Sequence, residues 1–307
     1  MFMDIDALKG ALEGVLDEND VLFGVPMASR TTFAIGGPAD VLALPRTFDQ
    51  VRGVLEACRR MGVPVRVMGL GSDVLVADEG LRCAVVAIAD NLSAVEVEGC
   101  VVRAQAGASN AQVARIACAA GLAGYEFASG IPGTVGGAAI MNAGAYGGEF
   151  KDVAESVRCL TPEGDFVDVD AEGAAWSYRR SMMDEAGYVV VSATLRLKPD
   201  DPAAIQARMD DLARKRAEKQ PLEMPSAGST FKRPEGFFVG KLVQDAGLRG
   251  FRVGGAQVSE KHTGFVVNAG GATAADVRSL IAEVQRRVLE GAGVRLQPEV
   301  RMWGFDD

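Results

Sequence analysis

Apolar side chains recur at helical spacing in several parts of the chain, and polar capping residues precede them. Between residues 48 and 61, Val51, Val54, Leu55 and Cys58 lie one to four positions apart, behind a capping box formed by Thr47 and Gln50. This pattern predicts a helix over 48–61. Further helices are predicted over Asp4–Asp17, 109–121, 201–219, 240–248 and 273–293, the last capped by Thr273.

Strands are predicted where apolar and β-branched residues run together between glycine-rich or polar breaks. The predicted ranges are 41–45, 64–69, 83–88, 94–98, 101–107, 188–197, 264–268 and 294–304. The first two strands and the helix between them form a β-α-β unit. The helix over 201–219 is highly charged and is predicted to be a solvated connector. The chain is therefore predicted to be mixed α and β, with a boundary near 200–220.

Charge and cysteine usage narrow the class of protein. The 307 residues carry 32 basic and 41 acidic side chains, a net charge of −9, which argues against a general nucleic-acid or anionic-membrane binder. None of the five cysteines forms a C-x-x-C pair, which favours reduced thiols in the cytoplasm. The acidic N-terminus does not resemble a signal peptide, and no apolar run is long enough to predict a membrane span.

Two glycine-rich stretches are the strongest candidates for chemistry. Residues 128–149 read ASGIPGTVGGAAIMNAGAYGGE, with seven glycines and no charge before Glu149, and residues 69–73 read GLGSD. Glycine permits positive φ and close approach of a ligand to the backbone, and successive N–H groups bind phosphate. We interpret the pair as a cradle for a dinucleotide or other large nucleotide, although any single glycine is better explained as a tight turn.

Standard nucleotide motifs do not fit these stretches. GLGSDV lacks the third glycine of the dinucleotide fingerprint and follows the second strand of its unit, not the first. GFFVGKL at 236–242 has three residues between its glycines where a Walker A loop has four, and Leu242 stands where Ser or Thr holds magnesium.

Longer motifs carry a family resemblance. GIPGTVGGAAIMNAGAYGGE closely resembles the flavin-binding segment of the UDP-N-acetylenolpyruvoylglucosamine reductase (MurB) family of peptidoglycan precursor synthesis. RTTFAIGGPAD (30–40) and GLGSDVLVAD (69–78) resemble the family's other FAD-contacting stretches, and YRRS (178–181) its Tyr-Arg-x-Ser element. SAGSTFKRP (226–234), residues 240–268 and LQPEVRMWG (296–304) follow in the family's order, so that the resemblance runs from about residue 28 to 304.

The resemblance implies an α+β fold: an FAD-binding domain of the vanillyl-alcohol-oxidase type, made of two subdomains, and a C-terminal α/β substrate domain. On this chain the implied ranges are a helical segment at 1–29, FAD subdomains at about 30–98 and 99–200, a connector helix at 201–219 and the substrate domain at 220–307. The implied reaction passes hydride from NADPH through FAD to UDP-N-acetylglucosamine enolpyruvate, which becomes UDP-N-acetylmuramate.

Three residues match the family's catalytic positions. Arg179 would bind and polarise the substrate carboxylate, Ser229 would donate a proton to the carbanionic intermediate, and Glu299 would help to stabilise that intermediate. Outside these motifs they would be read as a surface cation, a turn residue and a strand-edge charge. A clamp for the substrate's diphosphate would be formed by Lys232, Arg233 and Lys241. Weaker substrate-side candidates are Gln257, Lys261 and Asn268.

The flavin motifs imply a set of cofactor contacts, and Asp73 departs from the family pattern because asparagine is expected there. The contacts are Gly69, Gly71, Ser72, Asp73, Leu75, Ser129, Gly130, Ile131, Pro132, Gly133, Thr134, Gly136, Gly137, Asn142, Gly144 and Ala145. Tyr125 and Tyr146 are expected to be packing or flavin-pocket residues. His262 is the only histidine, so non-covalent FAD and no metal site are expected.

The chain is expected to belong to the branch of the family without an extra tyrosine-bearing loop, because no insertion lies between Arg180 and Lys198. Two alternatives stay open: another FAD oxidoreductase of this fold, such as a sugar or hydroxy-acid oxidase, and a non-catalytic flavin or UDP-sugar binding module. The partners expected are the UDP-sugar and NADPH, with no nucleic acid, membrane or obligate protein partner.

Overall fold

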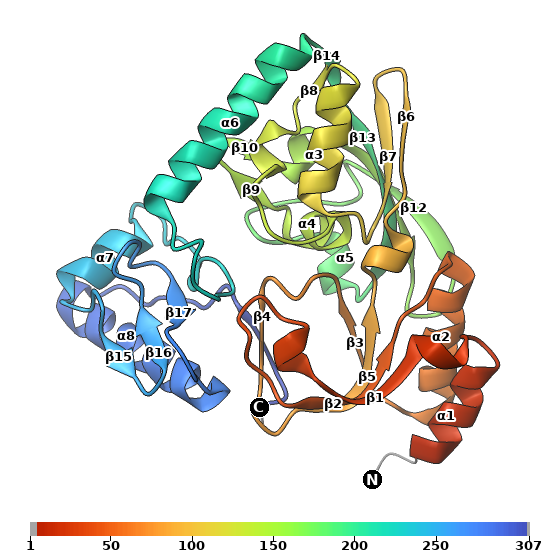
Figure 1. The fold of residues 1–307 in the computed structure, drawn as a ribbon, viewed down its shortest axis with the longest axis horizontal. Coiled ribbons are helices and arrows are strands. Elements are labelled where there is room, and N and C mark those ends of the chain that lie inside the picture. Colours follow the sequence, from red (N-terminus) through yellow and green to blue (C-terminus); the bar gives the residue numbers. More distant parts are fainter. Residues whose placement is uncertain (1–4, 306–307) are drawn as a thin grey trace. The chain divides into compact units, whose positions relative to one another are not determined.

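A computed structural model describes residues 5–305, which form two compact units (Figure 1). The first unit comprises the chain up to Leu22, Val41–Leu70 and Cys83–Arg216, and the second comprises Phe23–Asp40, Gly71–Arg82 and the chain from Ala217 onward. Both units are discontinuous in sequence, whereas the ranges expected from the motifs were contiguous. The predicted N-terminal helix began at Asp4, which lies outside the described residues.

The main sheet of the first unit is antiparallel, and its five strands run in the order β12-β11-β13-β7-β6. Along β7, Val102 and Ala104 are buried while Arg103 is exposed, which is the alternation that a sheet with one covered face requires. The strands are β6 (Val95–Glu98), β7 (Val101–Gln105), β11 (Ala154–Leu160), β12 (Phe166–Asp170) and β13 (Val189–Arg196).

Helices of the first unit contribute to its large apolar core. They are α1 (Ile5–Glu13), α2 (Phe48–Met61), α3 (Asn110–Ala119), α4 (Val135–Met141), α5 (Met182–Glu185) and most of α6 (Pro202–Lys219). The predicted bounds of α2 are confirmed, and the hydroxyl of Thr47 accepts a hydrogen bond from Gln50 N. The Gln50 side chain does not close the box, however, because its Oε1 accepts from Arg46 N at 2.7 Å.

A four-stranded sheet has the order β1-β2-β5-β3, where β3 and β5 are parallel. Its strands are β1 (Val21–Pro26), β2 (Pro38–Ala43), β3 (Val65–Met68) and β5 (Leu81–Ala87). The predicted β-α-β unit is β2-α2-β3, but β5 lies between its two strands. Short pairs complete the strands of the first unit: β8 (Leu122–Ala123) with β14 (Lys198–Pro199), and β9 (Gly144–Ala145) with β10 (Gly148–Glu149).

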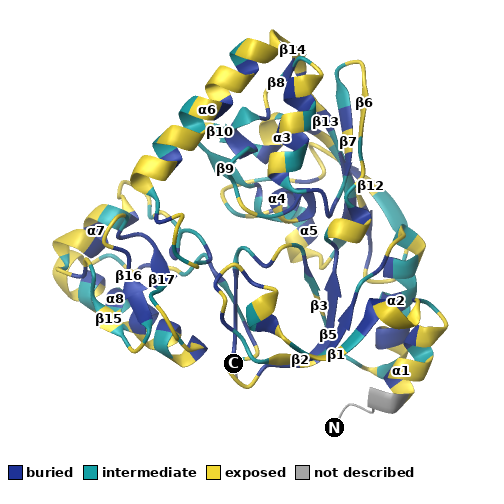
Figure 2. Cartoon of the chain, viewed as in Figure 1, coloured by how far each residue is buried: buried dark blue, intermediate teal, exposed yellow. Residues whose placement is uncertain are grey.

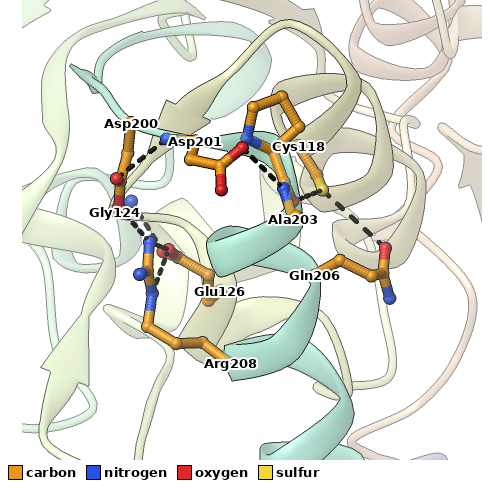
Figure 3. A network of polar contacts seen from close by, with 9 residues as sticks. Cys118, Gly124, Glu126, Asp200, Asp201, Ala203, Gln206 and Arg208 are labelled. Atoms are coloured by element: carbon orange, nitrogen blue, oxygen red, sulfur yellow. Dashed lines mark hydrogen bonds and ion pairs between the residues drawn. The ribbon is translucent and has the colours of Figure 1, made fainter.

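Helix α6 confirms the predicted helix but corrects its description as a solvated connector. Most of its surface is exposed in Figure 2, yet Ile205, Met209 and Arg216 are buried. Arg208 forms ion pairs with Glu126 at 2.8 Å and with Asp200 at 2.6 Å (Figure 3). The N-terminal part of α6 thus packs against the rest of the first unit, through contacts that its charged sequence does not predict.

The second unit has its own apolar core, around a three-stranded sheet and two helices. The capping box of α8 is confirmed, since Thr273 and Asp276 exchange both bonds. Strand β18 pairs in parallel with β4. The elements are β4 (Val74–Val76), α7 (Val239–Asp245), β15 (Arg252–Val253), β16 (Ala256–Val258), β17 (Val266–Asn268), α8 (Ala274–Ala292) and β18 (Arg301–Trp303).

Several predicted elements differ from the structure. The last strand was predicted over 294–304, but only Arg301–Trp303 is a strand, because Pro298 lacks the N–H that a ladder needs. The glycine-rich segment contains the helix α4, and β11 and β12 were not predicted. Five 3-10 turns also occur in the described residues: Glu18–Asp20, Met27–Ser29, Asp90–Leu92, Glu126–Ala128 and Phe150–Asp152.

Candidate functional site

In the first unit, the two glycine-rich stretches meet at Gly69 and Thr134. A Cβ placed on Gly69 would stand 2.4 Å from the Thr134 hydroxyl oxygen, closer than real Cβ atoms approach. Thr134 is buried and caps α4, and its hydroxyl accepts a hydrogen bond from Gly137 N at 3.3 Å. Gly69 is therefore needed for packing of the two stretches, whatever else binds there.

The turn before α4 has the properties of an anion-binding loop. Within residues 5–305, the N–H groups of Gly130, Gly133 and Thr134 find no hydrogen-bond acceptor. Gly133 has φ +116, which L side chains rarely adopt, and it turns the chain so that two successive N–H groups are bare. Ser129, Ile131 and Pro132 form the rest of this turn and are half-buried or exposed. This backbone fits a phosphate-bearing cofactor such as FAD.

Other glycines of the segment are explained by the protein's own packing. A Cβ on Gly136 would stand 2.9 Å from the Cβ of Ala106, and one on Gly144 would stand 2.8 Å from the carbonyl oxygen of Gly148. Gly144 and Ala145 form β9, one strand of a two-stranded hairpin. Gly137 differs, because it is exposed and its Cβ would meet only the Thr134 hydroxyl at 3.7 Å.

Asn142 serves the fold, in contrast to its predicted place among the cofactor contacts. Its side chain is fully buried, and its Nδ2 donates to Glu149 Oε2 at 3.0 Å and to the Ser177 carbonyl at 3.1 Å. Its Oδ1 accepts from Lys151 N at 3.0 Å. The amide can donate two bonds, and both go to the protein.

Arg179 lies in a loop, residues 176–181, which is tied to the C-terminal end of α4. Trp176 Nε1 donates to the Ala139 carbonyl at 2.7 Å, and the Ser181 hydroxyl donates to the Ile140 carbonyl at 2.8 Å. Arg179 itself has φ +57, a strained conformation for a residue with a side chain. Its guanidinium stands 4.9 Å from the centre of the Tyr178 ring. The loop is therefore built to hold one arginine in a fixed place.

In the second unit, RTTFAIGGPAD (30–40) lies beside residues 71–78 of the second flavin motif. Thr32 N donates to the Gly71 carbonyl at 3.1 Å, and a Cβ on Gly71 would stand 2.3 Å from the Arg30 carbonyl oxygen. Ser72 and Asp73 are half-buried, and the Asp73 carbonyl accepts from Arg301 N at 3.0 Å. Leu75 is fully buried in the apolar core of this unit, so its side chain serves the packing of the core.

The segments that carry Ser229 and Glu299 pair in the second unit although 70 residues separate the two side chains in sequence. Glu299 N donates to the Thr230 carbonyl at 2.9 Å, and Phe231 pairs with Pro298. Ser229 follows Gly228, whose φ is +75, and its hydroxyl donates weakly to the Phe231 carbonyl at 3.3 Å. Both side chains are half-buried, which leaves them reachable by a ligand. Arg179, the third predicted catalytic residue, belongs to the first unit.

The predicted substrate contacts divide into two groups. Gln257 is buried, and it accepts from Arg252 and donates to the Gly250 carbonyl. Asn268 donates to the Phe33 carbonyl and accepts from the N–H groups of Gly270 and Ala272. These two amides are used by the fold.

The cations have exposed charges and remain suited to a diphosphate. Lys232 is half-buried, and its backbone N donates to the Gln297 carbonyl. Arg233 is exposed, with its guanidinium 4.0 Å from the centre of the Phe238 ring. Lys241 is exposed and pairs with Asp245 at 2.8 Å. The weaker candidate Lys261 reaches Glu223 at 3.7 Å.

Arg216, which was not among the predicted site residues, lies against the glycine-rich segment. A Cβ on Gly130 would stand 2.8 Å from Arg216 Nε, and the guanidinium lies 5.8 Å from the centre of the Tyr146 ring. Burial lowers the pKa of this guanidinium. The sequence could have indicated that Arg216 is buried, because Arg216 falls on the same face of the predicted helix as the apolar residues Ile205 and Met209.

The structure also bears on other classes of site. Within residues 5–305, no cluster of His, Cys, Asp and Glu could hold a metal ion, and no helix is both long and apolar enough to cross a bilayer. Burial lowers the pKa of His262, whose Nδ1 accepts from Gly264 N. A surface pocket of ≈ 390 Å³ lies beside the ion pair of Glu126 and Arg208 and contains none of the predicted site residues.

Comparisons with known proteins find two matching family models. Residues 38–170 match the model of an FAD binding domain, and residues 220–303 match that of the UDP-N-acetylenolpyruvoylglucosamine reductase C-terminal domain. The predicted fold class, an FAD-binding domain followed by this C-terminal domain, is confirmed.

Relatives named UDP-N-acetylenolpyruvoylglucosamine reductase match nearly the whole chain. One from Alkaliphilus metalliredigens is 47% identical and aligns over 98% of this chain and 99% of its own. Another from Agathobacter rectalis is 52% identical over 91% of this chain and 92% of its own. The crystal structure of the Thermus caldophilus enzyme superimposes with a TM-score of 0.79 at 36% identity, covering 91% of this chain and 97% of that one. This chain therefore belongs to the UDP-N-acetylenolpyruvoylglucosamine reductase family of FAD-binding oxidoreductases.

Proposed function

We propose that this protein reduces UDP-N-acetylglucosamine enolpyruvate to UDP-N-acetylmuramate for peptidoglycan precursor synthesis in the cytoplasm, with NADPH as hydride donor. Membership of the family supports this reaction. The observation that carries the assignment of residues is the helix α4. It begins in the glycine-rich turn and ends in hydrogen bonds to the loop of Arg179. One rigid element thus joins backbone suited to a cofactor phosphate with a cation suited to a substrate carboxylate.

When bound, FAD supplies the transfer of hydride from NADPH to the terminal vinyl carbon of the enolpyruvyl group. The N–H groups of Gly130, Gly133 and Thr134 would bind its phosphates, and Gly137 would leave room beside the backbone. We further propose that FAD is held non-covalently. The only histidine of the chain, His262, lies in the second unit and outside the flavin segment.

Hydride addition to the vinyl carbon moves negative charge towards the carboxylate of the substrate. A guanidinium binds a carboxylate with two parallel hydrogen bonds and stabilises that charge as it develops. Arg179 is proposed for this role, because its backbone is held at φ +57. This conformation costs free energy, and backbone strain of this kind clusters at functional sites. Tyr178 restricts the guanidinium further by stacking against it.

The carbon next to the carboxylate must then receive a proton. Ser229 is proposed as the donor, since its hydroxyl makes a weak 3.3 Å bond to the Phe231 carbonyl and can turn towards a ligand. Glu299 lies on the neighbouring chain segment and is proposed to stabilise the intermediate. Half-buried Lys232 and exposed Arg233 and Lys241 are proposed to bind the diphosphate.

The test is NADPH oxidation by the purified holoenzyme, with and without UDP-N-acetylglucosamine enolpyruvate. We expect oxidation to depend on the enolpyruvate and kcat to fall by about 10²- to 10⁴-fold in Ser229→Ala, as expected for loss of a general acid. Ser93→Ala is the matched control, because the Ser93 hydroxyl donates only to the Asp90 carbonyl. Bound FAD without enolpyruvate-dependent turnover would refute the proposed reaction, and unchanged kcat in Ser229→Ala would refute the proposed acid.

A further inference from the structure

Glu149 is the charged residue that ends the glycine-rich segment, and its carboxylate is surrounded by hydrogen-bond donors. Asn142 Nδ2 donates to its Oε2 at 3.0 Å, and Lys151 Nζ lies 2.8 Å from the same oxygen. Its backbone N donates to Asp152 at 2.8 Å in a capping box. The side chain is 31% exposed, so it is fixed mainly by these partners.

The carboxylate of Glu149 is one of three groups that fix the orientation of the Asn142 amide, together with the Ser177 carbonyl and the Lys151 N–H. An ionised carboxylate only accepts hydrogen bonds, so the amide must present its nitrogen to it. The second N–H of that nitrogen then points to the Ser177 carbonyl, at 3.1 Å, and the amide oxygen accepts from Lys151 N. A neutral glutamine at 149 could still accept from this nitrogen, but the bond would lose the strength that the negative charge gives it. The amide, and with it the bond to Ser177, would then be held less firmly.

Ser177 stands two residues before Arg179, and its carbonyl is one of the points that fix the loop. Ser177 and Arg180 pair with each other, and Arg179 lies in the turn between them, at φ +57. Arg179 also acts on Glu149 through its charge. The pKa of Glu149 is lowered, first by the hydrogen bond from Lys151, then by that from Asn142 and by the charges of Lys151 and Arg179. Two independent links, one of hydrogen bonds and one of charge, thus join the carboxylate to the arginine.

We propose that Glu149 is a positioning residue for Arg179, acting through Asn142 and through its charge to hold the 176–181 loop in the conformation that binds the substrate carboxylate. This inference rests on the role proposed above for Arg179. Glu149 need not touch the substrate. It makes the orientation of the catalytic guanidinium depend on the same segment that forms the flavin turn.

The experiment compares two ligands that differ in one group. UDP-N-acetylmuramate carries a lactyl carboxylate, and UDP-N-acetylglucosamine lacks it. The dissociation constant of each is measured on the holoenzyme by calorimetry, for the natural protein and for Glu149→Gln, Asn142→Gly and Arg179→Lys. The control is Glu155→Gln, an ion-paired carboxylate of the same unit whose partner is Arg196. Asn142→Gly keeps the left-handed backbone, at φ +42, while it removes the amide.

We expect Glu149→Gln to weaken binding of UDP-N-acetylmuramate about tenfold, the effect of losing a charge-assisted hydrogen bond, and to leave UDP-N-acetylglucosamine unchanged. In turnover, KM for the enolpyruvate should rise more than KM for NADPH. Asn142→Gly should reproduce this pattern, and it carries the test if Glu149→Gln does not retain FAD.

The outcomes separate the inference from the proposed function. If Arg179→Lys loses the preference for the carboxylate ligand but Glu149→Gln and Asn142→Gly both keep it, Glu149 does not position Arg179 and the proposed reaction stands. If Arg179→Lys keeps the preference, Arg179 does not bind the carboxylate, and the inference fails together with that role. Equal weakening of both ligands by the Glu149 and Asn142 variants would show a merely structural role.

Discussion

Gly137→Ala distinguishes glycines that the cofactor needs from glycines that the fold needs. Gly137 is helical and exposed, and a Cβ there meets only the Thr134 hydroxyl at 3.7 Å, an ordinary contact. In the protein without FAD, alanine should therefore stabilise α4 by about 0.5–1 kcal/mol, because it has less backbone entropy to lose. In a chain of this size the gain corresponds to a rise in Tm of about 1–3 °C.

The same methyl should weaken FAD binding if the cofactor lies against this backbone. Inserting a methyl into a close contact costs about 1–3 kcal/mol, so the Kd should rise about 5- to 150-fold. The assay is a titration of the apoprotein with FAD, followed by flavin fluorescence, together with the Tm of the apoprotein. Gly69→Ala is the contrasting variant, because its Cβ would stand 2.4 Å from the Thr134 hydroxyl and should destabilise the apoprotein directly. A Gly137→Ala protein with raised Tm and unchanged Kd would refute the placement of FAD against this turn.

Three further predictions follow from other parts of the chain. Asp78→Ala should lower the free energy of unfolding, measured in urea, by about 0.5–2 kcal/mol. The reason is that the two carboxylate oxygens of Asp78 accept from Ala274 N and Ala275 N at the start of α8. An unchanged Kd for FAD would separate this capping role from contact with the cofactor. Hydrogen bonds from Arg286 and then Arg287 lower the pKa of Glu283 to about 2. The stability that this group contributes is therefore fully present above about pH 4.5 and is lost as the pH falls towards 2. Glu283→Gln should flatten the acid limb of a plot of Tm against pH. An unaltered acid limb would contradict this prediction. Burial raises the pKa of the Cys58 thiol to about 11 and that of the Cys159 thiol to about 12. At pH 8 an alkylating reagent should therefore label half-exposed Cys100 first, as measured by mass spectrometry. Faster labelling of Cys58 would contradict the burial argument.

Local patterns in the sequence were sufficient for much of the secondary structure. The bounds of α2, the caps Thr47, Ser109 and Thr273 and the glycine-rich turn depend on interactions between residues a few positions apart, so the sequence displays them directly. Long ordered motifs identified the family for a similar reason. Each keeps its residues close together in sequence, and their order along the chain is itself informative.

Tertiary structure decided which of those residues are available for chemistry. Asn142, Gln257 and Asn268 have polar side chains in matched motifs, yet hydrogen bonds within the fold use all three. The partners include distant segments for Asn142 and Asn268, and neighbouring residues for Gln257. Arg216 and Glu149 gained their importance in the opposite way, because residues far along the chain lie against the first, while Asn142 and Lys151 orient the second. A sequence specifies which groups a residue can offer, but the partners of a buried polar group are set by chain segments that meet only after folding, and those partners determine its role.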